Sequence, residues 1–88
     1  MTTAVQDNPG ASRFELDVGG QIVFALYRRD GATLYIRHVE APPPLRGTGA
    51  AGRLMEGIVE IATRENLAIV PICSYAAAWM RRHGPTRG

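Results

Sequence analysis

Three consecutive prolines, Pro42 to Pro44, divide this sequence of 88 residues into two parts. None of them has a backbone N–H, so neither a central strand nor the interior of a helix can run through the segment. A strand that precedes them must therefore end near Ala41. The residues that follow, Arg46-Gly47-Thr48-Gly49, contain two glycines and predict a loop that leads into the next element.

The part before the prolines predicts an antiparallel meander. Its segments either alternate apolar and polar residues or are rich in β-branched and aromatic residues, and Gly19-Gly20 and Asp30-Gly31 are turn signals between them. The three expected strands are residues 14–18, 21–29 and 33–39. On the last one, His38 alternates onto the face of Leu34 and Ile36, which favours a packed histidine.

The part after the prolines predicts helix, strand and helix. Apolar residues recur at helical spacing from about Gly49 to Asn66, and Asn66 is expected to form the C-terminal cap. Leu67 to Ile72 is a short apolar run, as expected of a strand covered on both faces, and Pro71 suggests that it ends, bulges or lies at an edge there. Ser74 is expected to cap a final helix from Tyr75 to about His83.

These elements predict an α+β fold in which an antiparallel β-meander is followed by helix, strand and helix on a mixed sheet. The crossover makes the strand of Leu34 and the strand of Ile72 parallel neighbours. The chain is long enough for one domain. We expect residues 1–12 to form a flexible tail with too little apolar surface to pack, residues 13–84 to form the domain and residues 85–88 to form a short tail.

Composition narrows the class of function. A net charge of +2 is too small to indicate nucleic acid binding, although the pI of 9.2 keeps an RNA-binding domain as a weak alternative. The single cysteine, Cys73, excludes an internal disulfide, and no metal-ligand spacing is visible. The first residues do not resemble a signal peptide and no apolar run is long enough for a bilayer, so we expect a cytoplasmic protein without membrane contact.

The glycine loop has the features of an anion site. A loop between a strand and a helix presents unpaired amides and the positive end of the helix dipole, and Arg46 adds a mobile charge. An ordinary turn into a helix is the alternative. Neither a P-loop, which needs lysine and Ser/Thr after its second glycine, nor a Rossmann fingerprint, which needs a third glycine, fits this segment.

The pattern of Arg46, Gly49 and Ala51 between a strand and an amphipathic helix resembles motif A of the GNAT superfamily of acetyltransferases. The stretch His38 to Ala51 followed by Val70-Pro71-Ile72-Cys73-Ser74-Tyr75 is similar to the minimal GNAT-like family, from about Phe14 to His83. The resemblance implies a truncated GNAT fold that lacks the first strand and two helices of larger relatives, so that the acceptor side is open. It also implies that acetyl-CoA is bound. The implied coenzyme-binding residues are Val39, Ala41, Leu45, Arg46, Gly47, Thr48, Gly49, Ala50, Ala51 and Cys73.

In the GNAT arrangement the strand before the loop and the following parallel strand splay apart, and the pantetheine arm pairs in the gap. This places the thioester near His38 to Glu40 and near Ile72 to Cys73, with a backbone amide of Val39 to Ala41 as the oxyanion donor. Glu40 is the first candidate for the general base, and a solvated edge carboxylate is the alternative. His38 is a second candidate, although structural packing is favoured for it.

The acid that protonates the departing thiolate is less well defined by the sequence. Larger GNAT enzymes often place a tyrosine where this sequence has Met80, which cannot donate a proton. Cys73 and Tyr75 are therefore the candidates, against the alternatives of a small buried hydrophobic residue and of packing at the helix start. Trp79 is expected in the core rather than at the coenzyme.

The resemblance therefore implies an N-acetyltransferase that transfers an acetyl group from acetyl-CoA to an unidentified amine. A non-catalytic acyl-CoA-binding or interaction module is the alternative, because the acceptor lid is missing and Met80 replaces the tyrosine. We expect a monomer or a weak homodimer.

Overall fold

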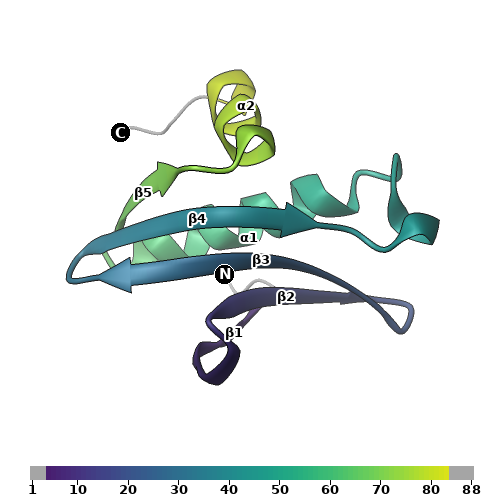
Figure 1. Cartoon of the computed structure of the whole chain (residues 1–88), viewed down its shortest axis with the longest axis horizontal. Helices are drawn as coiled ribbons and strands as arrows, with labels where there is room; N and C mark the ends of the chain where they lie inside the picture. Colours follow the sequence, from purple (N-terminus) through teal and green to yellow (C-terminus); the bar gives the residue numbers. More distant parts are fainter. Residues whose placement is uncertain (1–3, 84–88) are drawn as a thin grey trace.

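The computed structural model describes residues 4–83 and contains one five-stranded sheet with two α-helices (Figure 1). The strands are β1 (Gln6–Asn8), β2 (Arg13–Val18), β3 (Gln21–Asp30), β4 (Thr33–Glu40) and β5 (Ala68–Pro71). The helices are α1 (Ala50–Arg64) and α2 (Ser74–His83), and the short 3₁₀ helices are η1 (Pro9–Ala11) and η2 (Pro43–Leu45).

The sheet is mixed, as the sequence predicts. Its order is β1-β2-β3-β4-β5, with antiparallel pairing from β1 to β4 and parallel pairing between β4 and β5. Thr33 faces Ala68 and Ile36 faces Pro71, so the two strands joined by the α1 crossover are neighbours. The predicted α+β class and the predicted crossover are confirmed.

The N-terminal segment differs from its prediction. The expectation that residues 1–12 form a tail with too little apolar surface to pack is wrong for Val5 and for residues 6–8, whereas residues 1–3 lie outside the described part of the chain. Strand β1 pairs with the outer edge of β2, and the Val5 side chain is only 5% exposed. This pairing depends on contacts with residues distant in the sequence, which local composition does not reveal. Residues 84–88, with the predicted domain end and the short tail, are also not described.

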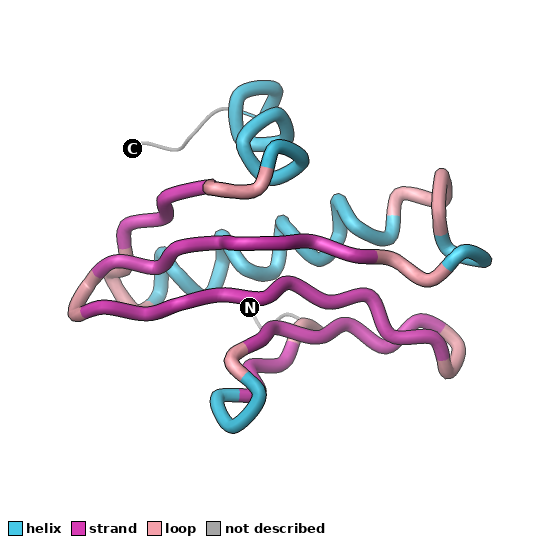
Figure 2. Tube along the Cα trace, viewed as in Figure 1, coloured by secondary structure: helices cyan, strands magenta, loops and turns pink. Residues whose placement is uncertain are grey.

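The core lies between the sheet and the helices (Figure 2). Helix α1 crosses one face of the sheet, and no helix of residues 4–83 covers the opposite face. Helix α2 adds Ala76 and Trp79 to the same core. The largest fully buried side chains are Phe14, Leu34, Ile36, Leu54, Met55, Ile58 and Val23. Neither described helix combines the length and apolarity needed to cross a membrane.

Two helix ends refine the predictions. Asn66 has a φ of 58°, and the amides of Leu67 and Asn66 bond to the carbonyls of Ala62 and Thr63. This is the Schellman pattern, in which a residue in the left-handed region follows the helix, as predicted for Asn66. The predicted cap of α2 is wrong by one residue, because Ser74 is the first helical residue and the Cys73 carbonyl accepts from the Ala77 amide.

Strand β5 also differs from its prediction. A strand covered on both faces was expected, but Val70 and the adjoining Ile72 are 39% and 60% exposed. The position at an edge, which was one of the outcomes suggested by Pro71, is confirmed. Helix α1 covers only one face of the sheet, and the exposure of Val70 indicates that the other face of β5 has no cover among the described residues. Pro71 ends the strand, which is one of the outcomes expected for a residue without an amide hydrogen.

Candidate active site

A β-bulge in β4 decides which side chains face the helices. Leu26 pairs with His38 and Tyr27 pairs with Ile36, so Arg37 has no partner in the register. The extra residue reverses the side-chain alternation of the strand. As a result Val39 packs against the core, whereas His38 points to the uncovered face. The expectation that His38 packs beside Leu34 and Ile36 is wrong for this reason.

Strands β4 and β5 separate directly before this point. Their pairing ends at Ile36 and Pro71, and the Ile36 carbonyl accepts from the amides of both Ile72 and Cys73, at 2.9 and 3.0 Å. Within residues 4–83, the last four residues of β4, residues 37–40, therefore have β3 on one edge and no strand on the other. An extended ligand could pair with this open edge.

The loop after β4 turns sharply because of two glycines. Gly47 and Gly49 have φ angles of 79° and 86°, which residues other than glycine adopt only at a cost in free energy. Thr48 stabilises the turn, because its hydroxyl donates to the Leu45 carbonyl at 2.6 Å and accepts from the Ala50 amide at 3.3 Å. Thr48 is thus a structural residue of the loop.

The turn leaves several backbone amides without acceptors. In the described part of the chain, the amides of Gly47, Gly49, Ala51 and Gly52 donate to no protein group. The first turn of α1 holds no acidic residue, so nothing within that turn competes for the positive end of the helix dipole. Unpaired amides at the start of a 15-residue helix, with small side chains around them, form a site that suits a phosphate group.

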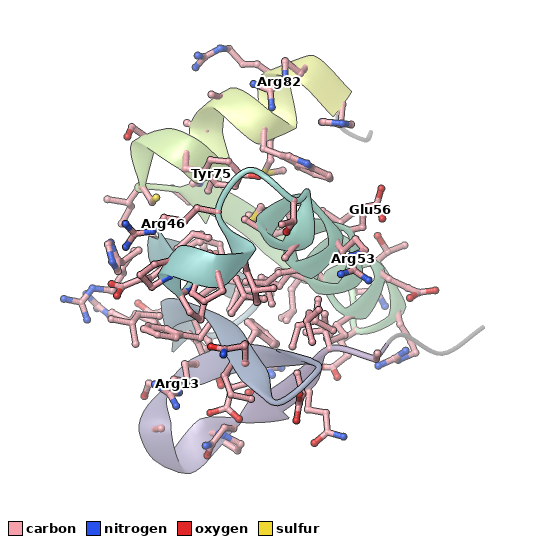
Figure 3. All side chains as sticks on the ribbon, turned by 90° about the vertical axis from the view of Figure 1, so that its right-hand side faces the viewer. Arg13, Arg46, Arg53, Glu56, Tyr75 and Arg82 are labelled. Atoms are coloured by element: carbon pink, nitrogen blue, oxygen red, sulfur yellow. The ribbon has the colours of Figure 1, made fainter. Side chains whose placement is uncertain are left out.

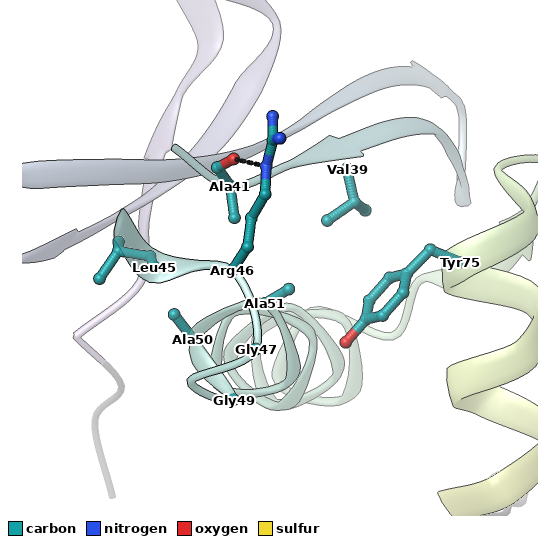
Figure 4. A pocket seen from close by; sticks show the side chains of 9 residues that line it. All are labelled: Val39, Ala41, Leu45, Arg46, Gly47, Gly49, Ala50, Ala51 and Tyr75. Atoms are coloured by element: carbon teal, nitrogen blue, oxygen red, sulfur yellow. Dashed lines mark hydrogen bonds between the residues drawn. The ribbon is translucent and has the colours of Figure 1, made fainter. Parts of the chain in front are cut away.

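Arg46 is held beside this site rather than free. Its Nε donates to the Ala41 carbonyl at 3.1 Å, a contact that ties the loop back to the end of β4 (Figure 4). The terminal guanidinium nitrogens have no acceptor among the described residues. They can therefore donate to an anionic ligand, which is the role expected of an arginine here.

A pocket of about 340 Å³ lies between the end of β4, the glycine loop and α2. Its lining residues are Val39, Ala41, Leu45, Arg46, Gly47, Gly49, Ala50, Ala51 and Tyr75. All of the predicted coenzyme-binding residues except Thr48 and Cys73 thus line one pocket. Figure 4 shows the Tyr75 side chain reaching from α2 towards the start of α1, with its hydroxyl at the near end.

The predicted acid and base candidates lie around this pocket in different environments. The His38 Nε2 and the Glu40 Oε1 are 3.0 Å apart, on side chains that are about half exposed (52% and 51%), and neither residue lines the pocket. Cys73 is partly buried and packs against the core. Met80 also packs against the core, and Trp79 is buried in it, as expected.

Sequence reasoning missed one residue near the pocket. Gly52 lies in the first turn of α1, where a Cβ atom would be 3.4 Å from Trp79 Nε1 and 3.9 Å from the Tyr75 hydroxyl. A glycine inside an amphipathic helix costs stability relative to alanine, so it usually has a packing reason. A glycine inside the predicted helix was therefore the sequence signal that could have identified Gly52.

The residues of the site include no cluster suited to a metal, since no three His, Cys, Asp or Glu side chains gather within residues 4–83. The family model of the GCN5-related N-acetyl-transferases matches residues 13–87, which span strands β2 to β5, the glycine loop and both helices. The general chemistry of this family is acyl transfer. The chain therefore belongs to the GCN5-related N-acetyl-transferase family and has a truncated form of its fold.

Proposed function

We propose that this protein binds acetyl-CoA in the pocket between β4, the glycine loop and α2, and transfers the acetyl group to an amine. One observation carries the proposal: the open edge of β4 and the unpaired amides of the glycine loop border the same pocket. An extended pantetheine arm with amide groups suits the strand edge. A pyrophosphate suits the amides and Arg46.

Different residues of the pocket would contact different parts of the coenzyme. Gly47, Gly49 and Ala51 would donate their amides to phosphate oxygens, and the free end of Arg46 would add charge-assisted hydrogen bonds. Ala50 and Ala51 have side chains small enough for close approach. Val39 and Ala41 lie on the helix side of β4 and would contact the arm. A backbone amide of Val39 to Ala41 would stabilise the carbonyl oxygen as it gains charge.

Glu40 and His38 would handle the proton of the acceptor amine. They lie on the uncovered face of the sheet, opposite the side that Val39 and Ala41 face, so an amine could approach from there. In the reaction the amine nitrogen forms a bond to the thioester carbon, and the carbon–sulfur bond breaks. Glu40 would accept the proton of the amine, with His38 hydrogen-bonded to it at 3.0 Å.

Calorimetry with acetyl-CoA tests the binding step directly. The wild-type chain should bind, and Arg46→Glu should weaken binding by about tenfold or more, because a charge that attracts phosphate becomes one that repels it. Arg81→Glu makes the same charge change in the last turn of α2, among residues that do not line the pocket, and is the control. No binding at millimolar acetyl-CoA would refute the proposal.

Turnover separates this proposal from the alternative of a non-catalytic acyl-CoA module. That alternative is favoured by Met80, which packs against the core and has no proton to give. Steady release of free coenzyme A in the presence of a panel of amines would exclude it. Binding of acetyl-CoA without release of thiol for any amine would support it instead.

A further inference from the structure

The contact between α1 and α2 next to the pocket depends on the absence of a side chain at Gly52. A Cβ atom there would meet Trp79 Nε1 at 3.4 Å and Tyr75 Oη at 3.9 Å, so both aromatic side chains of α2 rest against the first turn of α1. A methyl group fits at these distances. A larger side chain would have to displace one of the two rings.

Both aromatic side chains carry donors without acceptors. Tyr75 lines the pocket, and its hydroxyl donates to no group in residues 4–83. Trp79 is only 7% exposed, and its indole N–H is likewise unpaired among these residues, although its ring stacks on His83 at 4.2 Å between centroids. Tyr75 is 36% exposed, so its hydroxyl is open to a ligand in the pocket, whereas Trp79 is buried and its unpaired indole N–H belongs to a class of group that usually has a partner.

The placement of Tyr75 differs from that of a proton donor at the thioester. Its hydroxyl lies against the turn whose Ala51 and Gly52 amides are unpaired, rather than at the separation of β4 and β5 (Figure 4). Figure 3 shows Tyr75 and Arg46 on the same side of α1, with Arg53 and Glu56 on its other side. Arg46 from the glycine loop and Tyr75 from α2 are thus two hydrogen-bond donors beside the start of α1.

We infer that Tyr75 donates a hydrogen bond to the anionic part of the coenzyme, and that Gly52 is a positioning residue that lets α2 approach closely enough for this contact. The inference rests on the proposed function, because it assigns a second donor to the same ligand. It assigns Tyr75 to binding, which leaves Cys73 as the candidate acid of the reaction.

Variants at Gly52 test the positioning role with coenzyme A as the probe. Gly52→Ala should keep the affinity near that of the wild type and should not lower the melting temperature, because alanine favours the helix. Gly52→Val should raise the Kd by about tenfold or more, since it pushes Tyr75 away. Glu56→Val introduces the same β-branched residue at an exposed position of α1 and should leave the Kd unchanged.

Two further measurements separate positioning from general damage. Trp79 is the single tryptophan of the chain, so its fluorescence emission should change in Gly52→Val and stay unchanged in Glu56→Val. Tyr75→Phe should raise the Kd by about tenfold through the loss of one hydrogen bond to a charged group. In the double variant, Gly52→Val with Tyr75→Phe, the loss should not exceed that of Gly52→Val alone.

The outcomes distinguish the two proposals. If wild-type protein binds no coenzyme A, both the proposed function and this inference fail. If wild-type protein binds but Gly52→Val or Tyr75→Phe binds equally well, only the inference fails. Losses that add in the double variant would show that Gly52 does not act through Tyr75, and would overturn the positioning role.

Discussion

The hydroxyl of Tyr27 donates to Oδ1 of Asp7 at 2.6 Å, which joins β3 in the interior of the sheet to β1 at its edge. The Tyr27 ring is 7% exposed and lies 4.6 Å from the ring of Phe14, measured between centroids. Burial, followed by the hydrogen bond to Asp7, raises the pKa of Tyr27 to about 12. The contact explains why a segment of low apolar content folds onto the domain.

Tyr27 should make the protein less stable in alkali. Above pH 10, its ordinary pKa, the unfolded chain gives up the proton, whereas the folded chain keeps it until about pH 12. The folded state then binds more protons, so the free energy of unfolding should be fully retained below pH 10 and should fall from pH 10 to 12. Urea unfolding at a series of pH values measures this fall.

Tyr27→Phe should reduce that alkaline fall and should cost about 1–2 kcal/mol at pH 7, because Asp7 loses its donor. Tyr35→Phe is the matched control, since the Tyr35 hydroxyl donates to no acceptor in the described part of the chain. An unchanged pH dependence in Tyr27→Phe would contradict the assignment.

Gly49 and Gly20 have nearly equal positive φ angles, and a comparison of the two separates backbone strain from coenzyme binding. Gly49 has φ 86° and Gly20, in the turn between β2 and β3, has φ 88°, and a Cβ at either would meet nothing within 4 Å. Alanine at each position should therefore cost a similar amount, about 1 kcal/mol, through backbone strain alone. Thermal unfolding compares the two.

Binding should tell these variants apart. Gly49→Ala should also weaken acetyl-CoA binding, because the new methyl group and the shifted turn keep phosphate away from the loop amides. Gly20→Ala should bind like the wild type. Equal affinities for the two variants would mean that the loop of Gly49 does not contact the coenzyme.

Glu40→Gln should lower turnover with little change in coenzyme affinity. The amide has nearly the same shape as the carboxylate but cannot accept the amine proton, so the rate should fall by about a hundredfold or more. Glu56→Gln, at an exposed position of α1, is the control for the loss of one charge. A pH–rate profile that keeps its acidic limb in Glu40→Gln would show that another group is the base.

The parts of the fold and of the candidate site that could be predicted are those whose sequence signals are local. The proline segment, the turn glycines and the periodicity of α1 are local, and they placed the loop, the helix and the parallel strand correctly. The bulge at Arg37 has no such signal, because the alternation of β4 gives no sign that a residue is unpaired until β3 is aligned with it. For that reason Glu40 and the loop could be proposed, but the outward position of His38 could not.

Long-range pairing limited the remaining predictions. Strand β1 is held by Tyr27, which lies 20 residues beyond Asp7 in the sequence. The role of Gly52 depends on its contacts with Trp79 and Tyr75, which lie on another helix. The apolar run of β5 is equally compatible with a strand covered on both faces and with a strand covered on one, and only the packing of the folded chain distinguishes them.

Cys73 should affect turnover rather than coenzyme binding. The residue packs against the core next to the separation of β4 and β5, and it does not line the pocket of the glycine loop. Proton transfer from a thiol to a departing thiolate exchanges like groups and so has little intrinsic cost, which makes Cys73 suited to act as the acid. Cys73→Ala should therefore lower kcat and keep the Kd for coenzyme A near the wild-type value.

Cys73→Ser separates this role from packing. Serine is close to cysteine in size but is a much weaker acid, so it should lower kcat almost as far as alanine does, while thermal unfolding reports any loss of packing in each variant. Mass spectrometry of the protein after incubation with acetyl-CoA tests the competing possibility that Cys73 is itself acetylated. A stable acetyl group on Cys73 that passes to the amine would replace the acid role with a covalent one, and full turnover in Cys73→Ala would exclude both.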